Sequence, residues 1–286
     1  MIQASELILN PDGSVYHLNL KPEHIAHNII FVGDQDRVEK ITQLFDTIEF
    51  STQKREFKTQ TGTYKGSRIS VISTGIGPDN IDIVMNELDA LVNIDFQTLA
   101  PKQELTALNI VRIGTSGSLQ PDIPCDSIVM SQYAIGLDNM LRSYLIDAIT
   151  HTEIENAFME QTNWDAKKGR PYVIENSKKL EALFDDASIF KGFTGTAGGF
   201  YGPQGRVLRL AIQDPNLNQK MDQFSYNGIK MTNLEMETAA IYGLGKLLGH
   251  HCLSLNAIIA NRATGTFSNN PYKAVDALIS YALDKF

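Results

Sequence analysis

Short runs of β-branched residues alternate along this chain with stretches whose apolar residues recur every three to four positions. Five runs are typical of buried strands, at residues 29–32, 69–72, 110–113, 127–130 and 253–260. Three stretches have the apolar stripe of a helix face, at residues 81–92, 236–248 and 275–283. The alternation predicts an α/β fold with helices flanking a mixed central sheet.

The length and composition favour one domain spanning residues 1–286. Of the 286 residues, 43% are hydrophobic and 20% are charged, so the chain can bury a large core. Residues 138–185 form the most polar and least periodic stretch, and they include Trp164. We expect them to form an excursion with an exposed helix, not a linker.

Charge and cysteine usage argue against several classes of partner. The chain carries 25 Lys and Arg against 33 Asp and Glu, a net charge of -8 without a basic stripe, so we expect no nucleic acid partner. Its longest apolar runs span a few residues, and no signal peptide is visible at the amino terminus, so we expect no membrane and a cytoplasmic location. Two distant cysteines and paired histidines that lack a third ligand predict no metal site.

Turns that follow the expected strands combine glycine with arginine. Gly33 precedes Arg37, and Arg112 precedes Gly114 and Thr115. Bare backbone amides beside a guanidinium suit phosphate, although glycine can simply form the turn and arginine can simply lie on the surface. Arg112 favours the binding interpretation because it interrupts an apolar run, where a charge needs a partner. No turn matches a dinucleotide fingerprint or a P-loop.

Two further clusters admit both a structural and a functional interpretation. Glu235 and Glu237 stand where the helix expected at residues 236–248 begins. They can complement the helix dipole in its first turn, or accept hydrogen bonds from sugar hydroxyls at a strand-to-helix junction. In the loop at residues 200–206, Gln204 and Arg206 can be surface groups beside core aromatics. Alternatively, an amide two residues from a guanidinium can recognise a flat ring with an N–H beside carbonyls.

Eight segments, taken in this order, resemble nucleoside phosphorylase family I over roughly residues 16–286. They are HLNL at 17–20, VGDQDRVEK at 32–40, REF at 55–57, STGIG at 73–77, RIGTSG at 112–117, FYGPQGR at 200–206, NLEME at 233–237 and NR at 261–262. Each segment alone is weakly specific, but eight segments in the family's order are strong evidence for the resemblance. The resemblance implies a single-domain mixed sheet, partly barrel-like, with flanking helices, and homodimers with shared active sites that can assemble into hexamers.

The resemblance also implies roles for individual residues. The phosphate site would comprise Gly33, Arg37, Arg112 and Thr115, with Arg55 from a neighbouring subunit. The ribose site would comprise Met236 and Glu237, with His17 from the neighbour. The base site would comprise Phe200, Gln204, Arg206 and Arg262. Of these, Arg206, Gln204, Glu237 and Arg112 would carry catalysis.

Within the family, the chain is most similar to the uridine-cleaving members. Gln204 and Arg206 match the uracil-specific pattern, and Asn261 stands where purine-cleaving relatives usually have an aspartate. The implied reaction is reversible phosphorolysis of uridine to uracil and ribose 1-phosphate, with inorganic phosphate as co-substrate and no cofactor. A monovalent cation near Glu56 and Ser73 is a further expectation.

Three alternatives remain open at this point: a purine nucleoside phosphorylase, a nucleoside hydrolase of the same fold, and a non-catalytic nucleoside-binding protein. The chain also departs from the bacterial pattern in the order of Gly202 and Pro203 and in the turn after Gly77. Residues 138–170 and the first dozen residues differ as well, so we expect an altered lid and altered subunit contacts.

Overall fold

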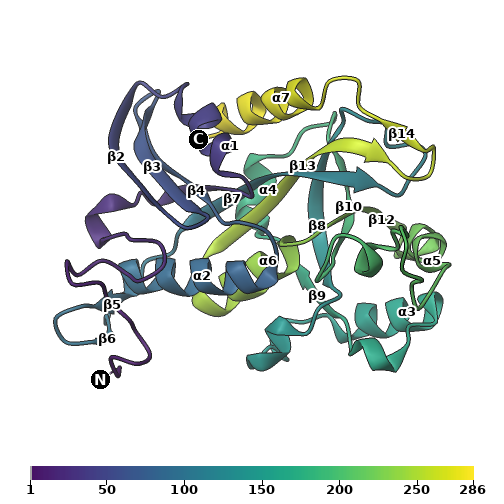
Figure 1. Cartoon of the computed structure of the whole chain (residues 1–286), viewed down its shortest axis with the longest axis horizontal. Coiled ribbons are helices and arrows are strands. Elements are labelled where there is room, and N and C mark those ends of the chain that lie inside the picture. The colour runs from purple at the N-terminus through teal and green to yellow at the C-terminus, as the bar shows by residue number, and fades with distance from the viewer. Residues whose placement is uncertain (1) are drawn as a thin grey trace.

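A large mixed β-sheet forms the centre of the molecule, which a computed structural model describes from residue 2 to residue 286 (Figure 1). Its strands are β1 (Asn28–Val32), β2 (Thr47–Lys54), β3 (Phe57–Tyr64), β4 (Ser67–Ser73), β7 (Asn109–Ser118), β8 (Ile128–Gly136), β9 (Tyr172–Glu175), β10 (Phe190–Thr196), β11 (Ser225–Tyr226), β12 (Ile229–Glu235), β13 (His251–Asn261) and β14 (Thr266–Phe267). The short strands β5 (Ile94–Asp95) and β6 (Ala100–Pro101) pair with each other.

Helices occupy both faces and one end of this sheet. The α-helices are α1 (Gln35–Thr42), α2 (Pro78–Asn93), α3 (Thr152–Thr162), α4 (Lys178–Leu183), α5 (Leu217–Gln223), α6 (Thr238–Leu248) and α7 (Pro271–Leu283). Short 3-10 helices lie at Pro22–His24, Met140–Ser143, Ala166–Lys168 and Gly202–Gln204. None of the helices in residues 2–286 is long and apolar enough to cross a membrane.

Part of the sheet closes on itself. The strand order is β11-β12-β10-β8-β13-β7-β1-β4-β3-β2, with β9 on β8 and β14 on β13. β12 also pairs with β7, antiparallel, so that β7, β13, β8, β10 and β12 form a ring. The predicted fold class, a mixed and partly barrel-like sheet with flanking helices, is therefore confirmed.

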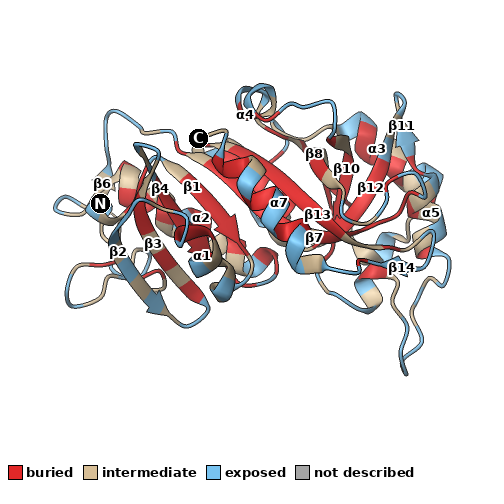
Figure 2. Ribbon diagram, turned by 90° about the horizontal axis from the view of Figure 1, so that it is seen from above, coloured by how far each residue is buried: buried red, intermediate tan, exposed pale blue. Residues whose placement is uncertain are grey.

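Alternating side chains of the central strands supply two apolar layers. Ile29 and Phe31 of β1 pack in the cluster that contains the inward faces of α2 and α6. Ile30 and Val32 pack in the opposite cluster, with α1 and α7. This two-residue period is what a strand buried on both faces requires. Figure 2 shows the central strands buried along their length, while α7 keeps one exposed face.

The predicted strands and helices are present, and the structure extends several of them. Gly249 has a φ of 80° and ends α6 in the left-handed conformation, as predicted. The prediction for residues 138–185 was partly wrong because this stretch contributes β9, whose Tyr172, Val173 and Ile174 are buried against β8. Its helix α3 is not simply exposed either, since Phe158 is buried.

Candidate active site

A cationic site lies where α1 approaches β7. Asp34 caps α1 by accepting a hydrogen bond from the Asp36 amide at 3.0 Å, and this cap places Arg37 in the first helical turn. Arg37 Nη1 donates to the Ile113 carbonyl at 3.3 Å. Burial, followed by the nearby charge of Arg112, lowers the pKa of Arg37. Two neighbouring guanidiniums favour an anion between them.

Arg112 lies inside the sheet and is held there by polar side chains from two other segments. Its exposed fraction is 6%. Arg112 Nη1 donates to Asn256 Oδ1 of β13 at 3.0 Å, and Nη2 pairs with Glu237. Glu235 Oε2 lies 3.5 Å from Nη1. Burial opposes the charge of Arg112, but the two carboxylates outweigh it and raise the pKa above its ordinary value.

The two carboxylates of the NLEME segment have different roles at the β12–α6 junction. The interpretation of both as first-turn residues was wrong, because Glu235 is the last residue of β12 and Glu237 precedes Thr238, where α6 begins; the two carboxylates stand at a strand-to-helix junction. Glu235 Oε2 accepts from the Glu237 and Thr238 amides at 2.8 and 2.9 Å, so Glu235 caps the start of α6. Glu237 instead accepts from the Gly77 amide at 2.9 Å and faces Arg112.

The electrostatic setting of Glu237 is unusual for a carboxylate. Burial raises its pKa, the paired guanidinium of Arg112 opposes this, and the neighbouring charge of Glu235 adds to it. Met236, between the two glutamates, is half-buried. A buried carboxylate whose second partner is a backbone amide is well placed to accept hydrogen bonds from hydroxyl groups.

The loop after β10 gathers the residues predicted to bind a base. Gln204, with 2% of its surface exposed, accepts at Oε1 from Arg206 Nη1 at 2.6 Å and from Arg262 Nη2 at 3.0 Å. The Arg206 guanidinium lies 3.7 Å from the centroid of the exposed Phe200 ring. Burial, followed by the charge of Arg206, lowers the pKa of Arg262 to about 10. The four residues form one cluster.

Strand β7 connects the cationic site to this base loop. It carries Arg112 and the half-buried Thr115, and its Ser116 Oγ accepts from Asn233 Nδ2 at 2.9 Å. At Gly117, an added Cβ would lie 3.5 Å from Arg262 Nε. Apart from His17 and Arg55, the residues predicted for phosphate, ribose and base therefore lie on this strand or on segments near it.

His17 and Arg55 lie together, outside this central group. His17 Nδ1 is 2.6 Å from Glu87 Oε1 on α2. Tyr16 lies between the two residues, with its ring centroid 4.9 Å from that of His17 and 5.9 Å from the Arg55 guanidinium carbon. Arg55 occupies the exposed turn between β2 and β3 with a φ of 54°. Within the described residues, no hydrogen bond joins either side chain to Arg112 or Glu237.

Two other expected residues have structural partners. Ser73 Oγ donates to the Glu56 carbonyl at 2.6 Å and accepts from the Lys58 amide at 2.8 Å. Asn261 Nδ2 donates to the carbonyls of Gln120 and Ile123, each at 2.8 Å, so its side chain is directed into the interior. Asn261 thus holds the turn at residues 120–123, which follows β7.

The sequence patterns did not single out Asn256 or the amide of Gly77, although each contacts the central charged pair. A usable signal existed for Asn256, because it is a polar residue inside the apolar run at 253–260, as Arg112 is in its own run. Gly77 lies in the STGIG segment, but its contact with Glu237 was not predicted, since it joins residues 160 positions apart.

Comparison with known proteins decides the family. The family model described as phosphorylase superfamily matches residues 28–281. The chain belongs to the phosphorylase superfamily. Membership makes it an enzyme, a pentosyltransferase, so the alternative of a non-catalytic binding protein is set aside.

Several relatives within the phosphorylase superfamily cover most of the chain. A uridine phosphorylase of Thermococcus kodakarensis is 29% identical over 281 residues, 95% of this chain and 86% of the relative. A DeoD-type purine nucleoside phosphorylase of Listeria monocytogenes is 26% identical over 251 residues, 87% of this chain and 88% of the relative. A solved nucleoside phosphorylase of Trypanosoma brucei, described as showing uridine phosphorylase activity, matches with a TM-score of 0.88 and 29% identity over 98% of both chains.

Proposed function

We propose that this enzyme catalyses the reversible phosphorolysis of uridine to uracil and ribose 1-phosphate. The observation that carries the proposal is the cluster of Gln204, Arg206 and Arg262 at the base loop. The two guanidiniums only donate hydrogen bonds, the amide of Gln204 both donates and accepts, and the cluster contains no carboxylate. Such a set suits a ring with two carbonyl acceptors and one N–H. The named activity of the Thermococcus and Trypanosoma relatives supports the same substrate.

Phosphate is proposed to bind Arg37, Arg112, Thr115 and the Gly33 amide, with Arg55 supplied by a partner subunit. Its oxygen attacks the anomeric carbon while the glycosidic bond breaks, and the sugar acquires oxocarbenium character. The ribose hydroxyls are oriented by Glu237, from the same subunit as Arg112, and by His17 of the partner subunit. No covalent enzyme intermediate is needed.

Binding of the base involves an exchange of hydrogen bonds. In the free enzyme, Gln204 Oε1 already accepts from Arg206 and Arg262. We expect uracil N3–H to replace Arg206 at that oxygen, which releases the Arg206 guanidinium to donate to uracil O4. Negative charge develops on O4 as the base leaves, so this contact is stronger in the transition state than in the ground state.

The two catalytic alternatives make different demands on the site. A purine phosphorylase needs a group for the purine N7, whereas Asn261 uses its amide on two backbone carbonyls. A hydrolase has no use for adjacent guanidiniums at Arg37 and Arg112. Uridine phosphorolysis accounts for both features.

The deciding experiment is an incubation of the purified enzyme with uridine, cytidine and inosine, with and without phosphate, with free base measured by chromatography. We expect phosphate-dependent release of uracil with formation of ribose 1-phosphate. Cytidine mismatches the site at N3 and at the 4-position, so its kcat/KM should be lower than that of uridine by about 10²-fold or more. Equal rates without phosphate, or inosine cleaved as fast as uridine, would refute the proposal. Gln204→Ala should lose the preference for uridine over cytidine.

We also propose that the enzyme acts in the cytoplasm as a homodimer with shared sites, which can assemble into hexamers. A monovalent cation beside Glu56 and Ser73 stays a prediction. Dialysis against a cation-free buffer followed by addition of potassium tests it, because the prediction requires a rise in stability or turnover.

A further inference from the structure

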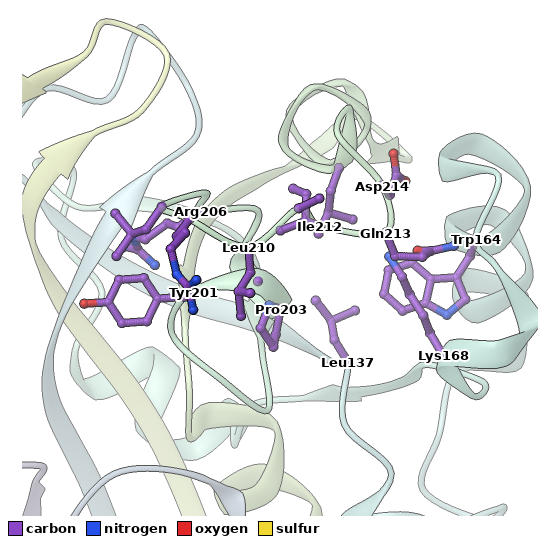
Figure 3. Close-up of a pocket in the computed structure, with 15 residues that line it drawn as sticks. Leu137, Trp164, Lys168, Tyr201, Pro203, Arg206, Leu210, Ile212, Gln213 and Asp214 are labelled. Atoms are coloured by element: carbon purple, nitrogen blue, oxygen red, sulfur yellow. The ribbon is translucent and has the colours of Figure 1, made fainter.

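A cavity of about 770 Å³ lies beside the base loop, lined also by Leu137, which follows β8, and by Leu217 of α5. Figure 3 shows the side chains around it. This volume falls in the range of small-molecule sites. Leu137, Pro203, Leu210 and Ile212 line its middle, between Arg206 at one end and Trp164 with Lys168 at the other. None of the sites assigned above uses this space, apart from the shared residue Arg206.

The charges that line this cavity are mainly positive. Lys168, Arg206 and Arg209 contribute cations, and among the described lining residues Asp214 is the single carboxylate. Asp214 is already paired with Lys220 at 2.8 Å. Lys168 Nζ lies 4.7 Å from the Trp164 ring centroid, and burial lowers its pKa. The cavity is therefore complementary to an anion.

The segment that borders the cavity leaves large apolar side chains uncovered. Leu208 and Leu210 have exposed fractions of 78% and 74%. Both line the cavity, and both lie in the segment without regular structure between the base loop and α5. Exposed leucines beside cations that have no carboxylate partner within residues 2–286 match a ligand with an apolar body and an acidic group.

We propose that this cavity binds a small organic acid with a bulky apolar body. Its carboxylate pairs with Arg209 and Arg206, and its body lies over Leu210 and Leu137 toward Trp164. Arg206 also donates to Gln204 at 2.6 Å, so a bound acid holds the guanidinium that uracil requires. The ligand therefore lowers turnover, a consequence that rests on the proposed uridine phosphorolysis.

Trp164, the one tryptophan of the chain, reports occupancy directly. The probe is 4-phenylbutyrate, with neutral 4-phenylbutanamide for comparison, in a titration of tryptophan fluorescence. We expect saturable binding of the acid and about tenfold weaker binding of the amide, the scale of one charged hydrogen bond. No fluorescence change, or equal binding of both compounds, would overturn the proposal.

Two exposed substitutions and one control locate the site. Leu210→Glu and Arg209→Gln should each weaken 4-phenylbutyrate binding at least about tenfold, because each removes complementarity to an apolar anion. Leu105→Glu makes the same change at another exposed leucine and should leave binding unaltered. Unchanged binding in Leu210→Glu would contradict the site. A shift of Leu210→Glu to a smaller oligomer in sedimentation would identify the patch as a subunit contact and also overturn the proposal.

The activity assay separates this inference from the proposed function. Saturating 4-phenylbutyrate should lower kcat/KM for uridine in the wild type and in Leu105→Glu, but not in Leu210→Glu. Binding without inhibition would refute the coupling through Arg206. Fluorescence binding in an enzyme that does not cleave uridine would refute the proposed function and leave the acid site standing.

Discussion

Arg112 owes its buried charge to acceptors from strands and turns that are distant in sequence. Asn256, Glu235 and Glu237 surround its guanidinium, and Glu237 is fixed in turn by the Gly77 amide. Preorganised donors of this kind need no rearrangement when charge develops on a substrate. The same arrangement makes the residue structurally costly to replace.

Arg112→Met should therefore lower both activity and stability. We expect a loss in kcat/KM of about 10²-fold or more, the scale for one charge-stabilising donor. The buried carboxylates left behind should lower the free energy of unfolding by about 3 kcal/mol or more. Steady-state kinetics and urea denaturation measure the two effects, with Arg68→Met at a surface ion pair as the control. Near-normal kinetics in a folded variant would return Arg112 to a purely structural role.

Asn261→Asp tests whether this position governs the choice of base. The aspartate would face the carbonyls of Gln120 and Ile123 without the two N–H donors that bind them now. We expect a loss of about 3 kcal/mol or more in unfolding free energy and no gain of inosine cleavage, because a buried unpaired charge is strongly destabilising. A stable variant that cleaves inosine would show that the side chain can turn toward the base, contrary to the structure.

At the scale of elements, period and residue type predicted β1, β4, β7, β8 and β13, but they missed the buried strands β9 and β10 and the exposed strand β2. β1 has a continuous apolar run and β4 has one that only Ser70 interrupts, whereas β2 is a solvent-exposed hairpin strand rich in polar residues, and its pattern gave no comparable signal. The apolar stripe predicted the helix from residue 236, two residues before α6 begins. Glu235 has the composition of a first helical turn, but its contacts with the following amides show that it caps the helix from the end of the strand.

The pH dependence of activity should reflect this junction. Glu237 must be ionised to accept hydrogen bonds from ribose hydroxyls, and burial raises its pKa above the ordinary value of 4.5. Because protonation then occurs at a higher pH than for an exposed glutamate, the acid limb of kcat/KM should lie above that value. A pH profile for uridine measures it, and Glu237→Gln should lack this limb while losing activity at all pH values. An acid limb at or below 4.5 would contradict the assignment.

At the scale of the whole molecule, part of the site could be named from sequence only through the family resemblance. Residue order cannot reveal that His17 and Arg55 meet across Tyr16 while Arg112 and Glu237 meet elsewhere, because these contacts depend on how distant segments pack. That both residues serve a neighbouring subunit follows from the family resemblance and stays a prediction. They lie on one surface, apart from the central charged group of their own chain.

Mixed oligomers test this division of the site. Arg55→Ala and Glu237→Ala remove groups from opposite halves of a composite site, so each variant alone should be nearly inactive. After co-refolding of equal amounts, half of the dimers are mixed and each has one intact site, so about a quarter of wild-type activity should return. Native mass spectrometry verifies the mixed dimers, and mixing either variant with itself is the control. If verified mixed dimers stay inactive, Arg55 and Glu237 belong to the same subunit's site. The surface formed by His17, Tyr16 and Arg55 then has another role.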